Sequence, residues 1–179
     1  MEEIMNDIIN AMVKRRSIRK FKPEMPRKED IDQIIEAGLW AASGKDNQNI
    51  ITVAVTNKEL RDKLSEANRQ IGGWKEGFDP FYGAPVVLIV LALKEWPTHV
   101  YDGSLVIGNM MLAADSLGLG SCWIHRAKEE FEQDEYKKIL KDLGIEAEYE
   151  GIGHCIVGYI DGEYPQAKER KDGRVYYID

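Results

Sequence analysis

The chain has 179 residues, of which 44% are hydrophobic and 31% charged, so it can build one well-cored domain but not two ordinary ones. Its formal net charge of -7 excludes a general nucleic-acid surface, because an acidic protein repels a polyanion at long range. The longest apolar run, residues 84–93, is shorter than the ~20 residues that span a bilayer, and the acidic start MEEIMND is not a signal peptide. We therefore expect a cytoplasmic protein that binds neither nucleic acid nor membrane.

Hydrophobic periodicity predicts an alternation of helices and strands. A first helix carries apolar residues from Ile4 to Val13, and Pro23 and Pro26 separate it from a second helix through Ile31–Leu39. Further helices are expected at 58–70, 102–117 and 129–143, and strands at 50–56, 86–93, 120–124 and 151–160. The continuous apolar run at 86–93 is typical of a strand buried on both faces. This order supports an α/β or α+β sandwich.

The stretch KRRSIRKFK, residues 14–22, places six cations and one serine in nine positions without a single acid. A phosphate is bound by forked guanidinium donors together with a hydroxyl or backbone N–H group at close range. Four residues within five positions supply that set: Arg15, Arg16, Ser17 and Arg19. The pattern predicts a phosphate anchor at the end of the first helix. The alternative is a solvated helix end whose cations favour the helix dipole, and the charge pattern alone leaves both open.

The glycine-rich pieces at 117–121 and 151–155 do not complete G-x-G-x-x-G, and no phosphate-binding G-x-x-x-x-G-K-[ST] motif occurs. Cys122 and His125, with His154 and Cys155, have the residue types of a zinc site. Strand alternation, however, points the adjacent His154 and Cys155 to opposite faces. We therefore expect buried free thiols and no metal.

Two further features leave alternatives open. The helix at 102–117 is rich in small residues, which suits either a tight subunit interface or a helix buried within one subunit. The C-terminal tail carries a second basic group, which either converges on the same anion as the first or is solvated: Lys168, Arg170, Lys171 and Arg174.

Four segments together resemble the FMN-dependent nitroreductase family: RRSIRKF at 15–21, AASGKDNQN at 41–49, DGSLVIGNMMLAADSLGLGSCWI at 102–124 and VGYIDGEYPQAKERK at 157–171. The resemblance implies an α+β fold, a three-layer α/β/α sandwich around a central, mostly antiparallel sheet. It implies that residues 1–179 form a single domain of an intertwined homodimer. Residues 161–179 would be a C-terminal extension that contacts the partner subunit.

The resemblance also implies an FMN site built from both subunits. Its phosphate and ribityl chain would be held by Arg15, Arg16, Ser17 and Arg19, with Arg16 or a neighbour facing the pyrimidine side of the ring. Lys168 and Arg170 would close over the phosphate from the tail. A basic group beside the pyrimidine stabilises the anionic reduced flavin.

On the ring side, Ser43, Gly44 and Gln48 match a loop that lies along the isoalloxazine from the other subunit. His125 and Arg126 match a pair whose backbone N–H groups lie near flavin N5. The sequence departs from the family pattern in the first loop, where Ala42, Asp46, Asn49 and Ile50 replace proline, asparagine and Pro-Trp. Asp46 would disfavour negative charge near the ring, unless Asn47 takes the amide role by a slip of one residue.

The function that this resemblance implies is a ping-pong oxidoreductase in which NADH or NADPH reduces the flavin and a nitroaromatic, quinone or similar small-molecule acceptor reoxidises it. No catalytic side chain is assigned. An aromatic segment would cap the acceptor: Trp74, Phe78, Phe81 and Tyr82. The alternatives are a flavin-binding or sequestering protein, and a dehalogenase-like or flavin-modifying enzyme of the same fold.

Overall fold

The computed structural model describes residues 6–179, so Ile4 and Met5 of the first expected helix lie outside the described residues. The helices are α1 (Asp7–Lys14), α2 (Lys28–Leu39), α3 (Lys58–Gly72), α4 (His99–Ser116), α5 (Ala127–Phe131) and α6 (Asp134–Asp142), with a short 3₁₀ turn η1 (Gly44–Asp46). The strands are β1 (Ile50–Val55), β2 (Val86–Leu93), β3 (Gly120–Ile124) and β4 (Tyr149–Gly158). None of the described helices is long and apolar enough to cross a membrane.

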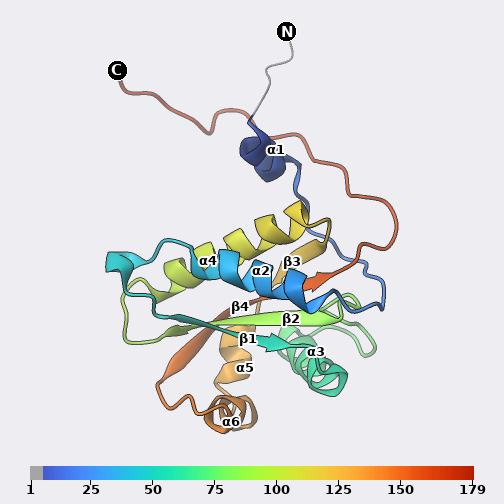
Figure 1. The fold of residues 1–179 in the computed structure, drawn as a ribbon, viewed down its shortest axis with the longest axis vertical. Helices are drawn as coiled ribbons and strands as arrows, with labels where there is room; N and C mark the ends of the chain where they lie inside the picture. The colour runs from blue at the N-terminus through green and yellow to red at the C-terminus, as the bar shows by residue number, and fades with distance from the viewer. Residues whose placement is uncertain (1–5) are drawn as a thin grey trace.

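The four strands form one sheet in the order β1-β2-β4-β3, and each neighbouring pair is antiparallel. Figure 1 shows α2 and α4 over one face of this sheet and α3, α5 and α6 over the other. Residues 86–92 of the central strand β2 are fully buried because both faces are covered. The expected three-layer sandwich with an antiparallel sheet is therefore confirmed.

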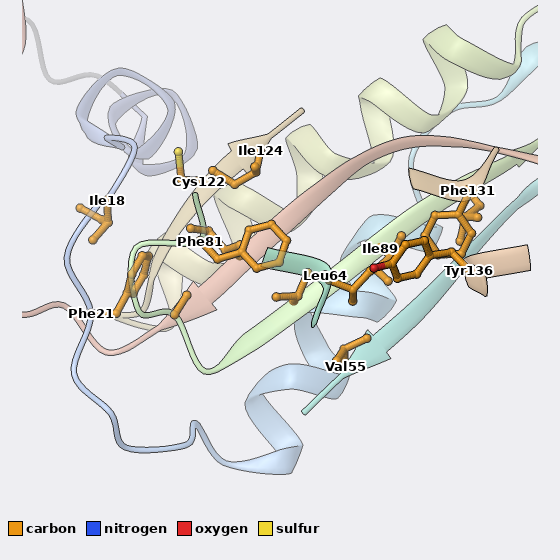
Figure 2. Close-up of a cluster of buried hydrophobic side chains, with 14 of the residues drawn as sticks. Ile18, Phe21, Val55, Leu64, Phe81, Ile89, Cys122, Ile124, Phe131 and Tyr136 are labelled. Carbon is orange, nitrogen blue, oxygen red and sulfur yellow. The ribbon is translucent and has the colours of Figure 1, made fainter. Parts of the chain in front are cut away.

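Each face of the sheet carries its own apolar core. Figure 2 shows the cluster on the face of α3, α5 and α6, with Ile18 and Phe21 at one end and Phe131 and Tyr136 at the other. The opposite cluster joins α2 and α4 to the sheet and contains Cys155. His154 instead packs its ring on Phe81, with ring centroids 5.2 Å apart. The predicted alternation of the adjacent His154 and Cys155 is confirmed.

The single helix expected at 129–143 is wrong, because the structure has two helices, α5 and α6, that break around Gln133. α5 buries Ala127, Glu130 and Phe131, whereas α6 buries Tyr136 and Leu140. At ~100° per residue these two sets would lie on opposite sides of one continuous helix, so only a break lets both reach the core. The last strand also begins before its expected start, at Tyr149, and α4 begins before its expected start, at His99.

Helix α1 buries none of its residues. Its apolar side chains are half exposed or more: Ile8, Ile9, Met12 and Val13. Figure 1 shows α1 outside the three layers, beside α4 and close to the path of the C-terminal tail. The apolar face of α1 is therefore uncovered in the described part of a single chain.

Candidate functional site

The basic segment begins where α1 ends, with Arg15 as the C-terminal cap. The Arg16 guanidinium folds back, and its Nη1 donates to the carbonyl oxygens of Val13 and Arg15 at 2.7 Å each. Arg15 Nη1 and Arg16 Nε are buried, and neither has a hydrogen-bond acceptor within residues 6–179. Because a buried guanidinium nitrogen without an acceptor is costly, these two donors indicate a site for an anion.

Strand β3 fixes the course of this segment. Ser17 forms a parallel bridge with Ser121, and the Ile18 N–H donates to the Ser121 carbonyl oxygen at 2.9 Å. A Cβ atom on Gly120 would lie 2.9 Å from the Ile18 side chain, so the glycine permits this close approach. Burial raises the pKa of the Cys122 thiol, although the nearby Arg19 and the Ser17 hydroxyl lower it in part. The cations therefore lie against the start of β3.

A tyrosine of the tail holds the segment from the other side. The Tyr164 hydroxyl donates to Asp115 Oδ1 at 2.6 Å and accepts from the backbone N–H of Arg16 at 3.0 Å. Burial and the hydrogen bond to Asp115 raise the pKa of this phenol. The sequence prediction missed Tyr164, since it considered only the charged residues of the tail.

Lys168 and Arg170 lie further along the tail and are exposed. No hydrogen bond or ion pair joins either side chain to another residue of the described chain. Figure 1 shows the tail leaving the end of β4 and running back past α1. Their role over a phosphate remains a prediction.

The loop at 43–49 is held by a buried carboxylate at the start of α4. Asp102 is 4% exposed, and its Oδ1 accepts the backbone N–H of Gly44 at 3.0 Å while its Oδ2 accepts the Thr98 hydroxyl at 2.8 Å. A Cβ atom on Gly44 would lie 2.4 Å from the Thr98 hydroxyl oxygen, so a side chain does not fit here. Ser43 Oγ accepts the N–H of Gln48 at 3.2 Å, which closes the loop.

The same loop is strained and carries unpartnered amides. Lys45, Asp46 and Gln48 all have φ between 52° and 56°, a region that costs non-glycine residues energy and that is frequent at functional sites. Asn47 Nδ2 and both amide atoms of Asn49 are buried and have no partner in the part of the chain that is described. Asp46 is exposed and accepts from Gln48. The loop thus holds two buried, unpartnered amide donors, one on Asn47 and one on Asn49.

At the far end of β3 the chain turns into α5 through His125 and Arg126. Arg126 has φ of 83°, and its guanidinium donates to Glu129 at 2.8 Å. Burial raises the pKa of Glu129, but the lowering effects, led by the hydrogen bond from Arg126, together outweigh it and hold that pKa below its usual range. Within residues 6–179 neither the His125 nor the Arg126 backbone N–H donates a hydrogen bond. The turn therefore presents two free backbone donors.

The cations of the basic segment, the loop at 43–49 and the β3–α5 turn do not meet within one chain. Ser121, beside the cations, and His125 are four residues apart on one strand, which places them roughly 13 Å from each other. The loop at 43–49 lies at the Asp102 end of α4, whereas Tyr164 ties the cations to Asp115, roughly 20 Å further along that helix. Strand β3 thus leads from the cations to the turn, and the loop lies at the other end of α4 from the cations.

The predicted aromatic cap is wrong for Phe81, which is fully buried between His154 and the Arg61 guanidinium. Trp74 and Phe78 contact each other with ring centroids 5.5 Å apart, and Trp74 is 41% exposed. Among the described residues, no three His, Cys, Asp or Glu side chains are grouped so as to hold a metal ion.

Comparison with known proteins identifies the family. The model of the nitroreductase family matches residues 12–159, which span the basic segment, the loop and the β3–α5 turn. The chain belongs to the nitroreductase family.

Solved nitroreductase structures share the whole fold. A Bacteroides fragilis nitroreductase with bound FMN is 27% identical, with a TM-score of 0.86 over 98% of this chain and 100% of the other. An FMN-dependent nitroreductase from Clostridium difficile is 26% identical, with a TM-score of 0.85 over 97% and 99% of the two chains.

An FMN reductase [NAD(P)H] from Bacillus subtilis is 30% identical over 139 residues, which are 65% of this chain and 53% of that protein. A further nitroreductase relative, from Methanothermobacter thermautotrophicus, is matched over 60% of its length. The chain therefore spans little more than half of these two relatives.

Proposed function

We propose that this chain binds FMN between two copies of itself and acts as an NAD(P)H-dependent oxidoreductase. The proposal rests on the buried, unpartnered guanidinium nitrogens of Arg15 and Arg16. They lie beside the start of β3, and this strand leads into the turn with the free N–H groups of His125 and Arg126. A ligand with a phosphate at one end and a polar ring at the other suits both ends. The FMN named in the structures of similar proteins is such a ligand.

The residues present fit this cofactor by their chemistry. Arg15, Arg16 and Arg19 offer guanidinium donors to a phosphate, and the Ser17 hydroxyl adds a short donor beside them. The free N–H groups of the β3–α5 turn would donate to acceptor atoms of the ring, and the buried amide of Asn47 would supply a further donor. Lys168 and Arg170 would join the phosphate side by a movement of the exposed tail.

A second copy would complete the site. The loop at 43–49 and the cations lie at opposite ends of α4, so an antiparallel α4 from another copy would bring its own loop toward these cations. The exposed face of α4 carries Tyr101 at 72% and Leu105 at 51% exposure, and α1 lies near the other end of α4, where Tyr164 joins Arg16 to Asp115. Covering these side chains would stabilise a homodimer.

The tail would take part in the same dimer. Val175, Tyr176, Tyr177 and Ile178 are 69% to 101% exposed, which leaves an apolar segment that no part of residues 6–179 covers. Tyr164 fixes the start of the tail, so residues beyond it could reach a second copy. We propose residues 161–179 as an extension of the single domain that contacts the partner subunit.

When held by these residues, FMN would supply the redox chemistry that links NADH or NADPH as hydride donor to a planar acceptor such as a nitroaromatic or quinone. The protein would position and shield the reacting groups, and no side chain is required to move a proton in the first half-reaction. Arginines near the pyrimidine would stabilise negative charge on the reduced ring. Trp74 and Phe78 would offer an aromatic surface to the acceptor.

The deciding experiment is the visible spectrum of the purified protein, reconstituted with FMN, before and after anaerobic addition of NADH and then NADPH. Loss of the flavin band near ~450 nm within seconds supports the oxidoreductase. A bound flavin that dithionite reduces but neither nicotinamide reduces would instead indicate a flavin carrier. Protein that retains no flavin after gel filtration would contradict the whole proposal.

Product analysis identifies the reaction once the flavin is shown to be reducible. Consumption of a nitroaromatic or quinone in step with NAD(P)H oxidation supports the proposed acceptor class. Release of halide from a halogenated aromatic, or breakdown of the flavin itself, would assign the chain to the dehalogenase-like or flavin-modifying alternative.

A further inference from the structure

A fully buried polar network lies directly behind the β3–α5 turn. Glu130 of α5, His154 of β4 and Asn68 of α3 are all 0% exposed. His154 Nε2 lies 2.8 Å from Glu130 Oε2, and Asn68 Nδ2 donates to Glu130 Oε1 at 2.6 Å. The proposed cofactor contacts use none of these side chains.

The network reaches the turn through two backbone carbonyls. Asn68 Nδ2 donates its second hydrogen to the His125 oxygen at 2.8 Å, and His154 Nδ1 lies 3.4 Å from the Ile124 oxygen. Glu130 Oε1 and the His125 oxygen orient the amide of Asn68, whose own oxygen has no partner among the described residues. Both carbonyls belong to residues that precede the free N–H groups, so the network fixes the direction of those donors.

Hydrogen-bond chemistry constrains the protons of this network. Both ring nitrogens of His154 face oxygen acceptors, and a neutral imidazole has only one N–H to donate. In addition, no Lys or Arg of the described chain forms an ion pair with Glu130, and an unpaired buried carboxylate is very costly. Both problems disappear if the pair holds one further proton, which makes it neutral overall whether that proton lies on nitrogen or oxygen.

We propose that Glu130 and His154 share this proton and, with Asn68, act as positioning residues that hold the β3–α5 turn with its N–H groups directed at the cofactor. The inference rests on the proposed function, since the turn matters only if a flavin lies against it. A neutral network also keeps a negative charge away from the reducible ring. Phe81, whose ring packs against His154 at an interplanar angle of 53°, covers the pair and excludes water from it.

The protonation state is tested on the protein without cofactor, so this arm does not depend on flavin binding. NMR of the imidazole nitrogens of His154 and the carboxyl carbon of Glu130 at about pH 7 reports where protons reside. We expect either a fully protonated imidazole ring or a protonated carboxyl group. A neutral imidazole with one bare nitrogen, next to an ionised Glu130, would overturn the shared proton.

The positioning role is tested with Glu130→Leu and Glu130→Gln, and with Glu132→Leu as the matched control on an exposed neighbour. Glutamine can donate to His154 and accept from Asn68, so it preserves a neutral network. Flavin fluorescence titration should give about five- to tenfold weaker FMN binding for Glu130→Leu and wild-type binding for the other two. The Arg126 amide signal should respond to FMN in wild type and Glu130→Gln but much less in Glu130→Leu.

Asn68→Ala removes the contact to the His125 carbonyl and serves if Glu130→Leu does not fold. It should weaken FMN binding in the same range and shift the His125 and Arg126 amide signals. Folded Asn68→Ala or Glu130→Leu protein with wild-type FMN affinity and an unchanged Arg126 response would overturn the positioning role. If wild-type protein binds no FMN at all, the proposed function fails, and the NMR result for the pair still decides the shared proton.

Discussion

A single carboxylate, Asp79, organises the segment between α3 and β2. It accepts the Ser65 hydroxyl at 2.6 Å, the Phe81 N–H at 2.9 Å and the Gly83 N–H at 2.7 Å, and it pairs with Arg61. Burial raises the pKa of Asp79, but the hydrogen bonds from Arg61, Ser65 and the Gly83 N–H, with the charge of Arg61, together outweigh burial, so the pKa lies below its usual range. One ionised side chain thus fixes the loop that carries Phe81 into the core.

We expect Asp79→Asn to lower the free energy of unfolding at pH 7 by about 2–4 kcal/mol, because the largely buried Arg61 loses one of its two carboxylate partners and keeps only Asp62. Since the folded-state pKa of Asp79 is depressed, its stabilisation is present above the unfolded value of ~3.9 and is lost as the pH falls through the folded value. Urea unfolding at several pH values measures both effects. Glu59→Gln, at an exposed position, is the control, and equal stability of the two variants would contradict this account of Asp79.

The arginines of the basic segment give a second prediction at this scale. Arg15→Ala combined with Arg19→Ala should weaken FMN binding at least ~100-fold, because each charge-assisted phosphate contact contributes ~1.5–3 kcal/mol. The control is Lys20→Ala combined with Lys22→Ala, which removes the same amount of charge from the same segment and should keep the flavin. Lys20 pairs with Asp161. Ultrafiltration and circular dichroism separate loss of flavin from loss of fold. Retained flavin in the arginine variant at micromolar protein would exclude these residues as the phosphate anchor.

At the scale of elements, α5 lies unusually close to β4. A Cβ atom on Gly151 would lie 2.2 Å from the carbonyl oxygen of Ala127, and backbone cannot move aside as a side chain can. We expect Gly151→Ala to lower the free energy of unfolding by about 1–3 kcal/mol or more through overpacking. Gly108→Ala is the comparison, since its Cβ would meet nothing within 4 Å among the residues that the structure describes. Thermal unfolding of both variants tests this, and an unchanged Gly151→Ala would show that α5 can shift freely.

Local patterns predicted much of the fold. The apolar run of β2 and the spacing around α2 and α3 gave the correct element types, because these depend on which faces are buried. The break between α5 and α6 was not predictable, since it depends on where the sheet lies relative to both buried sets. The same holds for the expected site: residues close together in the sequence were predicted, and contacts between distant residues were not.

A cluster of neighbouring cations can be recognised in a sequence, and the structure places Arg15, Arg16 and Ser17 together. Tyr164 contacts residues 148 and 49 positions away, and a single sequence carries no sign of such a pairing. The Glu130 and His154 pair was missed for the same reason, since 24 positions separate them. Distances along the chain thus limit what composition and periodicity can predict.

At the scale of the whole molecule, the exposed faces of α1 and α4 give a test of the proposed dimer. Leu105→Glu would bury a charge in that interface and should convert the dimer to monomers. Leu143→Glu makes the same change at the C-terminal cap of α6, across the sheet, at a similar exposure of 58% against 51%. Light scattering coupled to gel filtration measures the mass of each. A Leu105→Glu protein that stays dimeric would show that this face is not the interface.

The strand order also has a consequence for synthesis of the chain. β2 lies between β1, which precedes it, and β4, which begins only at Tyr149. At ~5–20 residues per second, a ribosome needs roughly 3–11 s to advance from Leu93 to Tyr149. During that interval the most apolar strand of the protein has one open edge, and the nascent chain depends on chaperones or on early packing of α4 to keep that edge from other chains.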